Sequence, residues 1–284
     1  MGNIDMDDLI GKTLRQYHVL EKIDEGGYAV VYKVRNTETD EIAVLKTVFM
    51  RKVKDPNAMV RFEQEADIIA ELDHHHIVPM YDHWHTEHSI FIIMQYMSGG
   101  SLRDVIKRNG AWSLQRTTLL LEQVTHALSA AHNAHIIHRD VKPANILLDD
   151  RYNAFLSDFG LAKRTRLDAK ITETHTIIGS PAYQAPEQII EEESITPRTD
   201  VYALGITLFE VLTGRHPFWG KTGTLGLMVK QLRDSLPPIH ASNPRVPATV
   251  NVVIQKATAK KPEARYPSVK AMYDDFRDAV QAVQ

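Results

Sequence analysis

The pattern of apolar residues changes at Ser98-Gly99-Gly100-Ser101, and this change constrains the fold of the chain most strongly. Before it, β-branched and aromatic residues form short runs between turn residues, which predicts strands over 17–23, 30–35, 41–49, 78–83 and 89–96. An amphipathic helix is expected between these strands, over 58–72. After the change, helical periodicity dominates, over 102–109, 113–134, 200–213, 222–235, 249–259 and 268–280. We therefore expect an α+β protein with a small β-rich lobe, a larger α-rich lobe and a ligand site where the lobes meet.

Charge and apolar content exclude several classes of protein. The 33 basic and 36 acidic residues give a formal net charge of -3, so the chain lacks the basic footprint of a nucleic-acid-binding protein. The longest apolar stretch, 201–212, contains Glu210 and is too short to span a bilayer. The N-terminal segment is acidic and has no apolar centre, unlike a signal peptide. We expect no nucleic-acid partner and no membrane segment within this chain.

The sequence contains no cysteine. Disulfides, thiolate zinc sites, iron–sulfur clusters and a cysteine nucleophile are therefore excluded. This composition is typical of a reducing compartment, and we expect a cytoplasmic protein, with a membrane anchor after Gln284 left open.

The segment His138-Arg139-Asp140-Val141-Lys142-Pro143-Ala144-Asn145 carries the strongest chemical signal. Its carboxylate, Asp140, can accept a proton from a hydroxyl group, and its ammonium, Lys142, can neutralise a transferring phosphoryl group. Asn145 offers a hard oxygen to a metal ion, and Asp158 in Asp158-Phe159-Gly160 offers a carboxylate. The structural alternative is a surface turn between a helix and a strand.

Together with Ala185-Pro186-Glu187 downstream, these segments resemble, in order and spacing, those of eukaryotic-type protein kinases. The chain is most similar to the bacterial serine/threonine kinases of that family, from about Tyr17 to about Val280. The resemblance implies the two-lobed kinase fold, with a nucleotide cleft between the lobes. It divides the chain into an N-terminal extension over 1–16, an N-lobe with hinge over 17–97 and a C-lobe over 98–284.

The resemblance also assigns the chemistry to four charged side chains. Asp140 would orient and deprotonate the acceptor hydroxyl, and Lys142 would stabilise the transferred charge. Lys46 would hold the α- and β-phosphates of ATP. Glu65, on the helix that follows, would pair with Lys46 and so make the site conditional on the position of that helix.

The cation and the nucleotide have implied ligands as well. Asn145 and Asp158 would bind Mg²⁺, or Mn²⁺ in its place. The complete set of nucleotide-binding residues implied by the resemblance is Asp24, Gly26, Gly27, Ala29, Val31, Ala43, Lys46, Met94, Gln95, Met97, Asn145, Leu147 and Asp158.

Adenine recognition would fall to the hinge and to apolar residues of both lobes. Met94 would be the gatekeeper, and the backbone of Gln95 and Met97 would hydrogen-bond the adenine edge. The apolar contacts to the ring would come from Val31, Ala43 and Leu147.

The glycine-rich loop departs from the family pattern G-x-G-x-x-G-x-V. Asp24 stands at the first glycine and Ala29 at the third, while Gly26 keeps its place beside Gly27. Glycines there let backbone N–H groups approach phosphate oxygens. The departure motivates the alternative of a nucleotide-binding pseudokinase that acts as a signalling scaffold. A small-molecule phosphotransferase is a second alternative, against which the Ala185-Pro186-Glu187 segment argues.

Several further residues would hold the fold together rather than react. The resemblance pairs Glu187 with Arg265 as a buried ion pair, and it places Asp200 against the backbone of the catalytic loop. It also implies a hydrophobic column made of Ile69, Met80, His138 and Phe159.

Substrate class and regulation are implied by residues around the activation segment. Lys142 together with Gly179-Ser180 resembles kinases that act on serine and threonine of proteins. Arg139 beside Asp140 predicts control by phosphorylation, since an arginine there can pair with a phosphate. The modified residues would be Thr172, Thr174 and, more weakly, Thr176. Autophosphorylation between two copies would require at least a transient homodimer.

Fourteen histidines raise the question of a metal site. Side chains of the consecutive His74-His75-His76 diverge and cannot share one ion. His83 and His85 can share one face of a strand, with His88 nearby, but cysteine or an obvious fourth ligand is missing from the sequence around them. We expect solvated surface histidines here.

Overall fold

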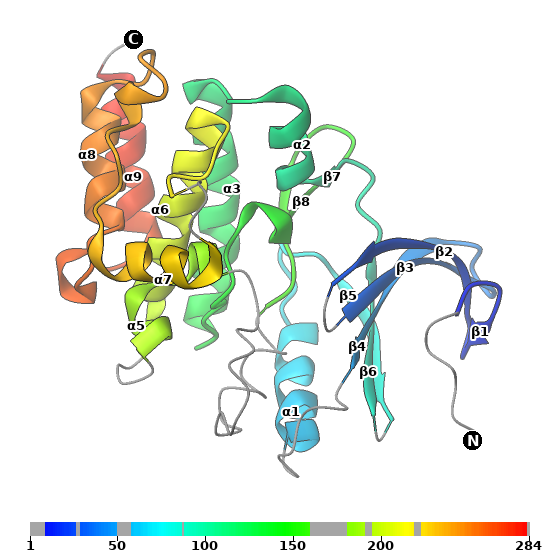
Figure 1. Cartoon of the computed structure of the whole chain (residues 1–284). Helices are drawn as coiled ribbons and strands as arrows, with labels where there is room; N and C mark the ends of the chain where they lie inside the picture. Colours follow the sequence, from blue (N-terminus) through cyan, green and yellow to red (C-terminus); the bar gives the residue numbers. More distant parts are fainter. Residues whose placement is uncertain are drawn as a thin grey trace. The chain divides into compact units, whose positions relative to one another are not determined.

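The computed structural model describes residues 9–26, 29–49, 58–86, 88–159, 181–190, 195–218 and 223–282 (Figure 1). Contacts between residues divide the chain into two compact units. The first unit takes in the described residues up to Asp73 together with Val78–Tyr96, and the second takes in His74–Ile77 and the described residues from Met97 onward. Each unit is described by itself.

The first unit is built on a six-stranded antiparallel sheet with the order β1-β2-β3-β4-β6-β5. Its strands are β1 (Thr13–Leu14), β2 (Tyr17–Glu25), β3 (Ala29–Asn36), β4 (Ile42–Phe49), β5 (Met80–His85) and β6 (Ser89–Gln95). Local turn chemistry sets the β3–β4 hairpin, because Oδ1 of Asn36 accepts from the N–H of Glu38 at 2.9 Å. Asp40 closes the same turn in the left-handed region at φ 60°.

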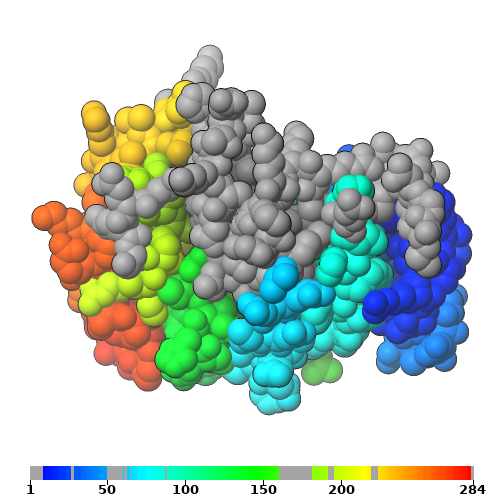
Figure 2. Space-filling model, turned by 90° about the horizontal axis from the view of Figure 1, so that it is seen from below, coloured from blue at the N-terminus to red at the C-terminus, as the bar shows by residue number. Residues whose placement is uncertain are grey.

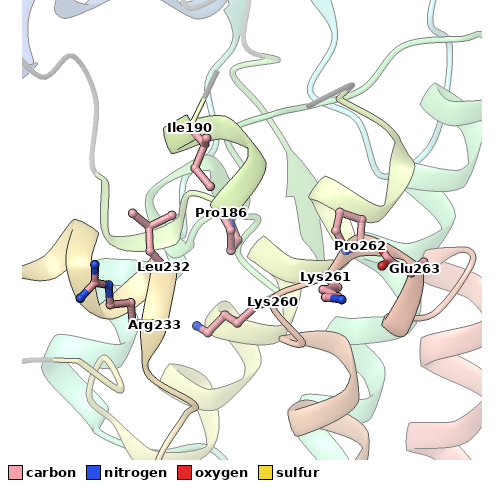
Figure 3. Close-up of a pocket in the computed structure, with 8 residues that line it drawn as sticks. All are labelled: Pro186, Ile190, Leu232, Arg233, Lys260, Lys261, Pro262 and Glu263. Carbon is pink, nitrogen blue, oxygen red and sulfur yellow. The ribbon is translucent and has the colours of Figure 1, made fainter. Parts of the chain in front are cut away.

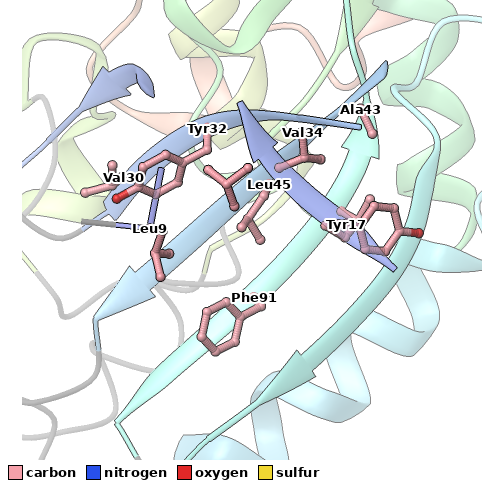
Figure 4. Packing of buried hydrophobic residues seen from close by; sticks show 10 residues of the cluster. Leu9, Tyr17, Val30, Tyr32, Val34, Ala43, Leu45 and Phe91 are labelled. Atoms are coloured by element: carbon pink, nitrogen blue, oxygen red, sulfur yellow. The ribbon is translucent and has the colours of Figure 1, made fainter. Parts of the chain in front are cut away.

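Apolar residues recur at every second position of the strands, so one face of the sheet carries a continuous buried cluster. Leu9 and side chains from alternate positions of β2, β3, β4 and β6 form a buried cluster, made of Leu9, Tyr17, Val19, Val30, Tyr32, Val34, Ala43, Leu45, Phe91 and Ile93 (Figure 4). Each fully buried aliphatic or aromatic side chain contributes about 1.5–3 kcal/mol of hydrophobic stabilisation. Helix α1 (Ala58–Ala70) packs against β5 and buries Ala66 and Ile69.

The second unit is mainly helical and is organised around α6 (Pro197–Thr213), which contacts α3, α8 and α9. The other helices of its described part are α2 (Leu102–Asn109), α3 (Leu114–Asn133), α5 (Pro186–Ile190), α7 (Gly223–Arg233), α8 (Ala248–Ala257) and α9 (Val269–Gln281). Short 3₁₀ helices are η1 (Pro143–Asn145), η2 (Pro181–Tyr183), η3 (Ile239–Ala241) and η4 (Pro262–Ala264). Within the described ranges, no helix combines the length and the hydropathy that a bilayer crossing requires.

A small three-stranded sheet in the second unit positions the loops that follow. It pairs β7 (Gly100–Ser101), β8 (Ile146–Leu148) and β9 (Ala154–Leu156), all antiparallel. Gly99 lies so close to this sheet that an added Cβ would stand 2.3 Å from the carbonyl oxygen of Asp149. The segment 98–101, at which the sequence pattern changes, thus contains the paired strand β7.

Candidate active site

Within the segment 138–145, the side chains of Lys142 and Asn145 both contact the carboxylate of Asp140. Nζ of Lys142 lies 2.8 Å from Oδ2 of Asp140, and both side chains are mostly buried, at 17% and 14% exposed. The amide nitrogen of Asn145 donates to the same Oδ2 at 3.0 Å and to the carbonyl oxygen of Asp140 at 2.8 Å. Two donors thus hold the Asp140 carboxylate in one orientation.

His138 fixes the backbone that carries Asp140. Its Nδ1 accepts from the N–H of Asp140 at 3.2 Å, and its Nε2 meets the carbonyl oxygen of Ser157 at 2.9 Å. A nitrogen that accepts is unprotonated and one that meets a carbonyl carries the proton, so this ring is neutral. Burial lowers the pKa of His138 and keeps it in that form, although nearby carboxylates act in the opposite direction.

Asp200, in the first turn of α6, holds the backbone of the 138–145 loop through its carboxylate. Oδ1 accepts from the N–H of Arg139 and Oδ2 from the N–H of His138, both at 2.9 Å. The predicted contact of Asp200 with the loop backbone is therefore confirmed. Nε2 of His132 lies 2.8 Å from the same Oδ2, a positioning contact that the sequence did not predict.

Two residues of this region adopt a left-handed backbone that side chains other than glycine rarely take. Arg139 has φ 64° and Asp158 has φ 58°. Such conformations cost about 1–3 kcal/mol each and persist where surrounding contacts over-determine them. One of these contacts comes from Gln188 of α5, whose Nε2 donates to the carbonyl oxygen of Arg139 at 2.9 Å.

Ser157, the residue that precedes Asp158, is hydrogen-bonded to Asn145. Its N–H and its Oγ donate to the carbonyl oxygen of Asn145 at 2.9 and 3.0 Å. Because the side-chain N–H₂ of Asn145 donates to Asp140, its Oδ1 is the atom that it can offer to a cation. Hard oxygen donors from an amide and a carboxylate suit Mg²⁺, which usually keeps water and phosphate oxygens as its other ligands.

The described residues contain no group of three or more His, Cys, Asp and Glu arranged to hold a metal ion. The two predicted ligands, Asn145 and Asp158, are fewer than the four that a structural zinc site uses. The donor set instead fits a cation that arrives with a phosphate ligand.

Comparison with known protein families shows which family this chain belongs to. The family described as "Protein kinase domain" matches residues 17–276. The chain belongs to the protein kinase domain family. The predicted resemblance is confirmed, and the residues of the catalytic loop can be read in the terms of that family.

The similarity to curated proteins named as serine/threonine-protein kinases extends over most of this chain. "Serine/threonine-protein kinase PrkC" of Bacillus subtilis is 37% identical over 276 residues, which is 96% of this chain and 42% of that protein. "Probable serine/threonine-protein kinase PknB" of Lactococcus lactis is 35% identical over 268 residues, which is 94% of this chain and 42% of that protein. The chain therefore spans less than half the length of these relatives.

Solved kinase structures share the fold. The kinase domain of Mycobacterium tuberculosis PknI superimposes with a TM-score of 0.76 at 24% identity, over 95% of this chain and 98% of that one. A structure described as Rad53 1-466 in complex with AMP-PNP gives a TM-score of 0.75 at 27% identity, over 91% of this chain and 64% of that one. The prediction of an α+β kinase fold is confirmed.

In the first unit, strand register places some of the predicted nucleotide-binding residues on one face. Val31 of β3 and Lys46 of β4 are direct partners, and Met94 of β6 is the partner of Val44. Because side chains alternate, Val44, two residues before Lys46, shares its face with these three. Ala43 was expected beside Val31, but it lies on the opposite face, in the core cluster of Figure 4. Val44 was not predicted, although counting back two residues from Lys46 could have found it.

The turn that begins the glycine-rich loop has its own hydrogen bonds. Oδ1 of Asp24 accepts from the N–H of Glu25 at 2.9 Å, so this carboxylate caps the turn. The N–H of Gly26 donates to the carbonyl oxygen of Ala29 at 2.8 Å. Gly27 lies outside the described residues.

The remaining predicted residues fall in several places. Glu65 belongs to α1, but its side chain is outside the described part of the chain. Gln95 ends β6, and Met97 is buried just after it in the second unit. Leu147 is half-buried in β8. The predicted phosphorylation sites Thr172, Thr174 and Thr176, and Ser180 with them, also lie outside the described residues.

Two predicted structural contacts are found in the second unit. Arg265 donates to both carboxylate oxygens of Glu187 at 2.7 and 2.8 Å, and the two side chains are 0% and 1% exposed. Burial raises the pKa of Glu187, but hydrogen bonds and charge from Arg265 outweigh it and hold the pKa below its usual value. The rings of His138 and Phe159, two of the four residues of the predicted column, are in contact in a tilted arrangement with centroids 4.7 Å apart.

The histidines of β5 bind carboxylates of α1. Nε2 of His83 lies 3.2 Å from Asp67, and Nε2 of His85 lies 2.8 Å from Glu63. These pairs join the helix to the edge of the sheet. They give His83 and His85 partners on α1, where the sequence had predicted solvated side chains.

Proposed function

We propose that this chain is the catalytic domain of a serine/threonine protein kinase, which transfers the γ-phosphoryl group of ATP to hydroxyl groups of proteins. The single observation that carries the proposal is the Asp140–Lys142–Asn145 cluster, in which one carboxylate is held by an ammonium and an amide. The names of the relatives and the bound AMP-PNP of a fold neighbour support the same substrate class.

The chemistry of the cluster follows from its charges. Asp140 accepts a hydrogen bond from the incoming hydroxyl and takes its proton as the oxygen attacks the γ-phosphorus, while the bond from that phosphorus to the β,γ-bridging oxygen breaks and ADP leaves. Lys142, 2.8 Å from Asp140, places a positive charge beside the oxygens on which negative charge accumulates. Lys46 would bind the α- and β-phosphates, and oxygens of Asn145 and Asp158 would hold Mg²⁺. When bound, Mg²⁺ neutralises charge on the phosphates. No covalent protein intermediate is required, so positioning and electrostatics supply the rate.

Regulation belongs to the same proposal. A phosphate on Thr172 or Thr174 would pair with the guanidinium of Arg139, whose backbone is tied to Asp200 and to Gln188. Modification by a second copy would proceed through a transient homodimer in the cytoplasm. Phosphate mapped by mass spectrometry to Thr172 and Thr174 after incubation with ATP is the expected result. Its absence from the whole segment 161–178 would remove this part of the proposal.

A pseudokinase scaffold is the second candidate, and it is favoured by Asp24 and Ala29 in the glycine-rich loop. Labelled ATP, Mg²⁺ and a generic acceptor protein distinguish the two. A kinase incorporates label into the acceptor and into itself, and the variant Lys46→Met loses this incorporation. Nucleotide binding without incorporation in the wild-type protein identifies the scaffold instead.

A further inference from the structure

A pocket of about 610 Å³ lies on the second unit, and its lining does not include the residues described above around Asp140 (Figure 3). Residues of α5, of the end of α7 and of the loop that enters η4 line it: Pro186, Ile190, Leu232, Arg233, Lys260, Lys261, Pro262 and Glu263. The lining combines apolar side chains with three cations and one carboxylate. Neither a purely apolar ligand nor a simple anion satisfies both features.

The apolar lining continues beyond the pocket along α7, which lies at the surface in yellow to orange (Figure 2). Leu225, Val229 and Leu232 recur at the spacing of one helix face. Leu225 is 73% exposed and Val229 is 49% exposed, and Ile190 across the pocket is 47% exposed. A row of large apolar side chains this exposed is typical of a surface that binds a partner.

The charges of the pocket select the partner. Arg233, Lys260 and Lys261 outnumber Glu263, whereas the chain as a whole carries a formal net charge of -3. Asp234, next to Arg233, offsets part of this excess. The ammonium of Lys260 faces inward, 2.8 Å from the carbonyl oxygen of Gln231 and 3.2 Å from the hydroxyl of Tyr202. Both hydrogen-bond partners are neutral oxygens, and the charge of Asp234 already acts on this ammonium. The exposed Arg233 and Lys261 are therefore the cations that an anionic ligand would meet.

The pocket is preformed by contacts that already hold the fold. Arg265 donates to the carbonyl oxygens of Lys260 at 2.9 Å and of Ala259 at 2.7 Å, and it pairs with Glu187 directly after Pro186. The buried Arg265 therefore fixes both the backbone at Lys260 and the position of α5 next to Pro186. A rigid site loses little entropy when it binds a flexible segment.

We propose that this pocket and the exposed face of α7 form a docking groove for an acidic peptide segment of a partner protein. An apolar side chain of the segment enters between Ile190 and Leu232, and its flanking carboxylates lie against Arg233 and Lys261. The groove is separate from the Asp140 cluster, so this inference goes beyond the proposed phosphoryl transfer. A partner bound here lies beside the Ala185-Pro186-Glu187 segment.

Fluorescence anisotropy with a synthetic peptide tests the groove in the absence of nucleotide, so its result is independent of kinase activity. The probe carries leucine and phenylalanine flanked by glutamates; companion peptides replace the glutamates by lysine or the two apolar residues by serine. We expect weak, roughly micromolar binding of the probe alone. Arg233→Glu combined with Lys261→Glu should weaken it about tenfold or more, and Ile190→Ser should act in the same direction.

Matched controls separate the groove from general surface effects. Arg245→Glu reverses an exposed charge elsewhere, and Val252→Ser removes an apolar side chain that is 64% exposed on α8. Both should bind the probe as the wild type does. Equal binding of the lysine peptide, or unchanged binding by the Arg233→Glu and Lys261→Glu variant, would overturn the proposal. Concentration-dependent dimers that Ile190→Ser abolishes would also overturn it, because a second copy would then be the occupant.

Discussion

Nζ of Lys142 lies 2.8 Å from Oδ2 of Asp140, and both side chains are mostly buried. The ammonium is thus positioned for the charge that develops during phosphoryl transfer. Lys142→Met should lower kcat about 100-fold while the KM for ATP changes little, because the interaction is made mainly in the transition state. Steady-state kinetics with a peptide acceptor measure both constants. A large rise in the KM for ATP at unchanged kcat would show that Lys142 binds nucleotide instead.

Asp200 orients the catalytic loop through hydrogen bonds to two backbone N–H groups. Asp200→Asn keeps the shape of the side chain but turns one acceptor into a donor that faces other donors. Displacement of the loop should lower kcat by about 10–100-fold. Nucleotide binding, measured separately by anisotropy, should persist.

His132 provides the matched test of that positioning, since it contacts the same carboxylate. His132→Gln can still donate to Asp200 and should retain more activity than His132→Ala. Equal activities of the two variants would show that the contact at 2.8 Å has no positioning role.

Glu187 and Arg265 form a buried pair whose partners depend on each other. Removing one partner leaves the other charge buried, so Glu187→Gln or Arg265→Met should each lower the free energy of unfolding by about 3–5 kcal/mol. The double variant should cost less than the sum of the two single changes. Urea unfolding of the four proteins gives the coupling energy, and strictly additive values would contradict a direct ion pair.

The same pair predicts a response to acid. The pKa of Glu187 is below its usual value in the folded protein, so the unfolded chain binds more protons as the pH falls through the carboxyl range. Its contribution to stability is present above the unfolded pKa and is lost as the pH falls through the folded pKa. The acid sensitivity of Glu187→Gln should therefore be smaller than that of the wild type.

His216 predicts a loss of stability at a milder pH. Its Nε2 meets the carbonyl oxygen of Ala182 at 2.9 Å, its Nδ1 accepts from the N–H of Phe218, and burial lowers its pKa to about 4. The unfolded histidine titrates near its ordinary value, so stability is full above that value and falls as the pH drops toward about 4. His216 alone should make the protein about 2 kcal/mol less stable at pH 5 than at pH 7.

Urea unfolding at the two pH values checks this expectation. His216→Gln, which can still donate to Ala182, should show a smaller difference between the two pH values than the wild type. His240→Gln, at an exposed position, is the control and should retain the full difference. A difference unchanged in His216→Gln would assign the acid sensitivity to other groups.

The sequence predicted long periodic elements well because their pattern repeats over several turns or strand positions. Helix α2 begins and ends where it was expected. Helix α6 begins three residues earlier than expected, at Pro197, because Thr196 caps it and proline is favoured in the first turn. Strands β7, β8 and β9 contain only two or three residues each, which is too short to generate a period.

The candidate site was predictable where motif spacing determines it, as for Asp140, Lys142 and Asn145. It was not predictable where the contact joins distant segments, since Gln188 and Ser157 reach the loop through hydrogen bonds that no local pattern encodes. Ala43 shows a third case, because neighbouring residues of a strand point to opposite faces of the sheet. The predicted residue is one position away from Val44, which shares the face of Lys46.

Transfer of labelled phosphate by wild type and by Asp140→Asn, with nucleotide affinity measured in parallel, tests the proposed catalytic role most directly. The substitution keeps the shape of the side chain and removes its capacity to take a proton. We predict that phosphate incorporation falls at least about 100-fold, with nucleotide affinity within about threefold of the wild type. Incorporation at the wild-type rate by Asp140→Asn would contradict the role assigned to this carboxylate.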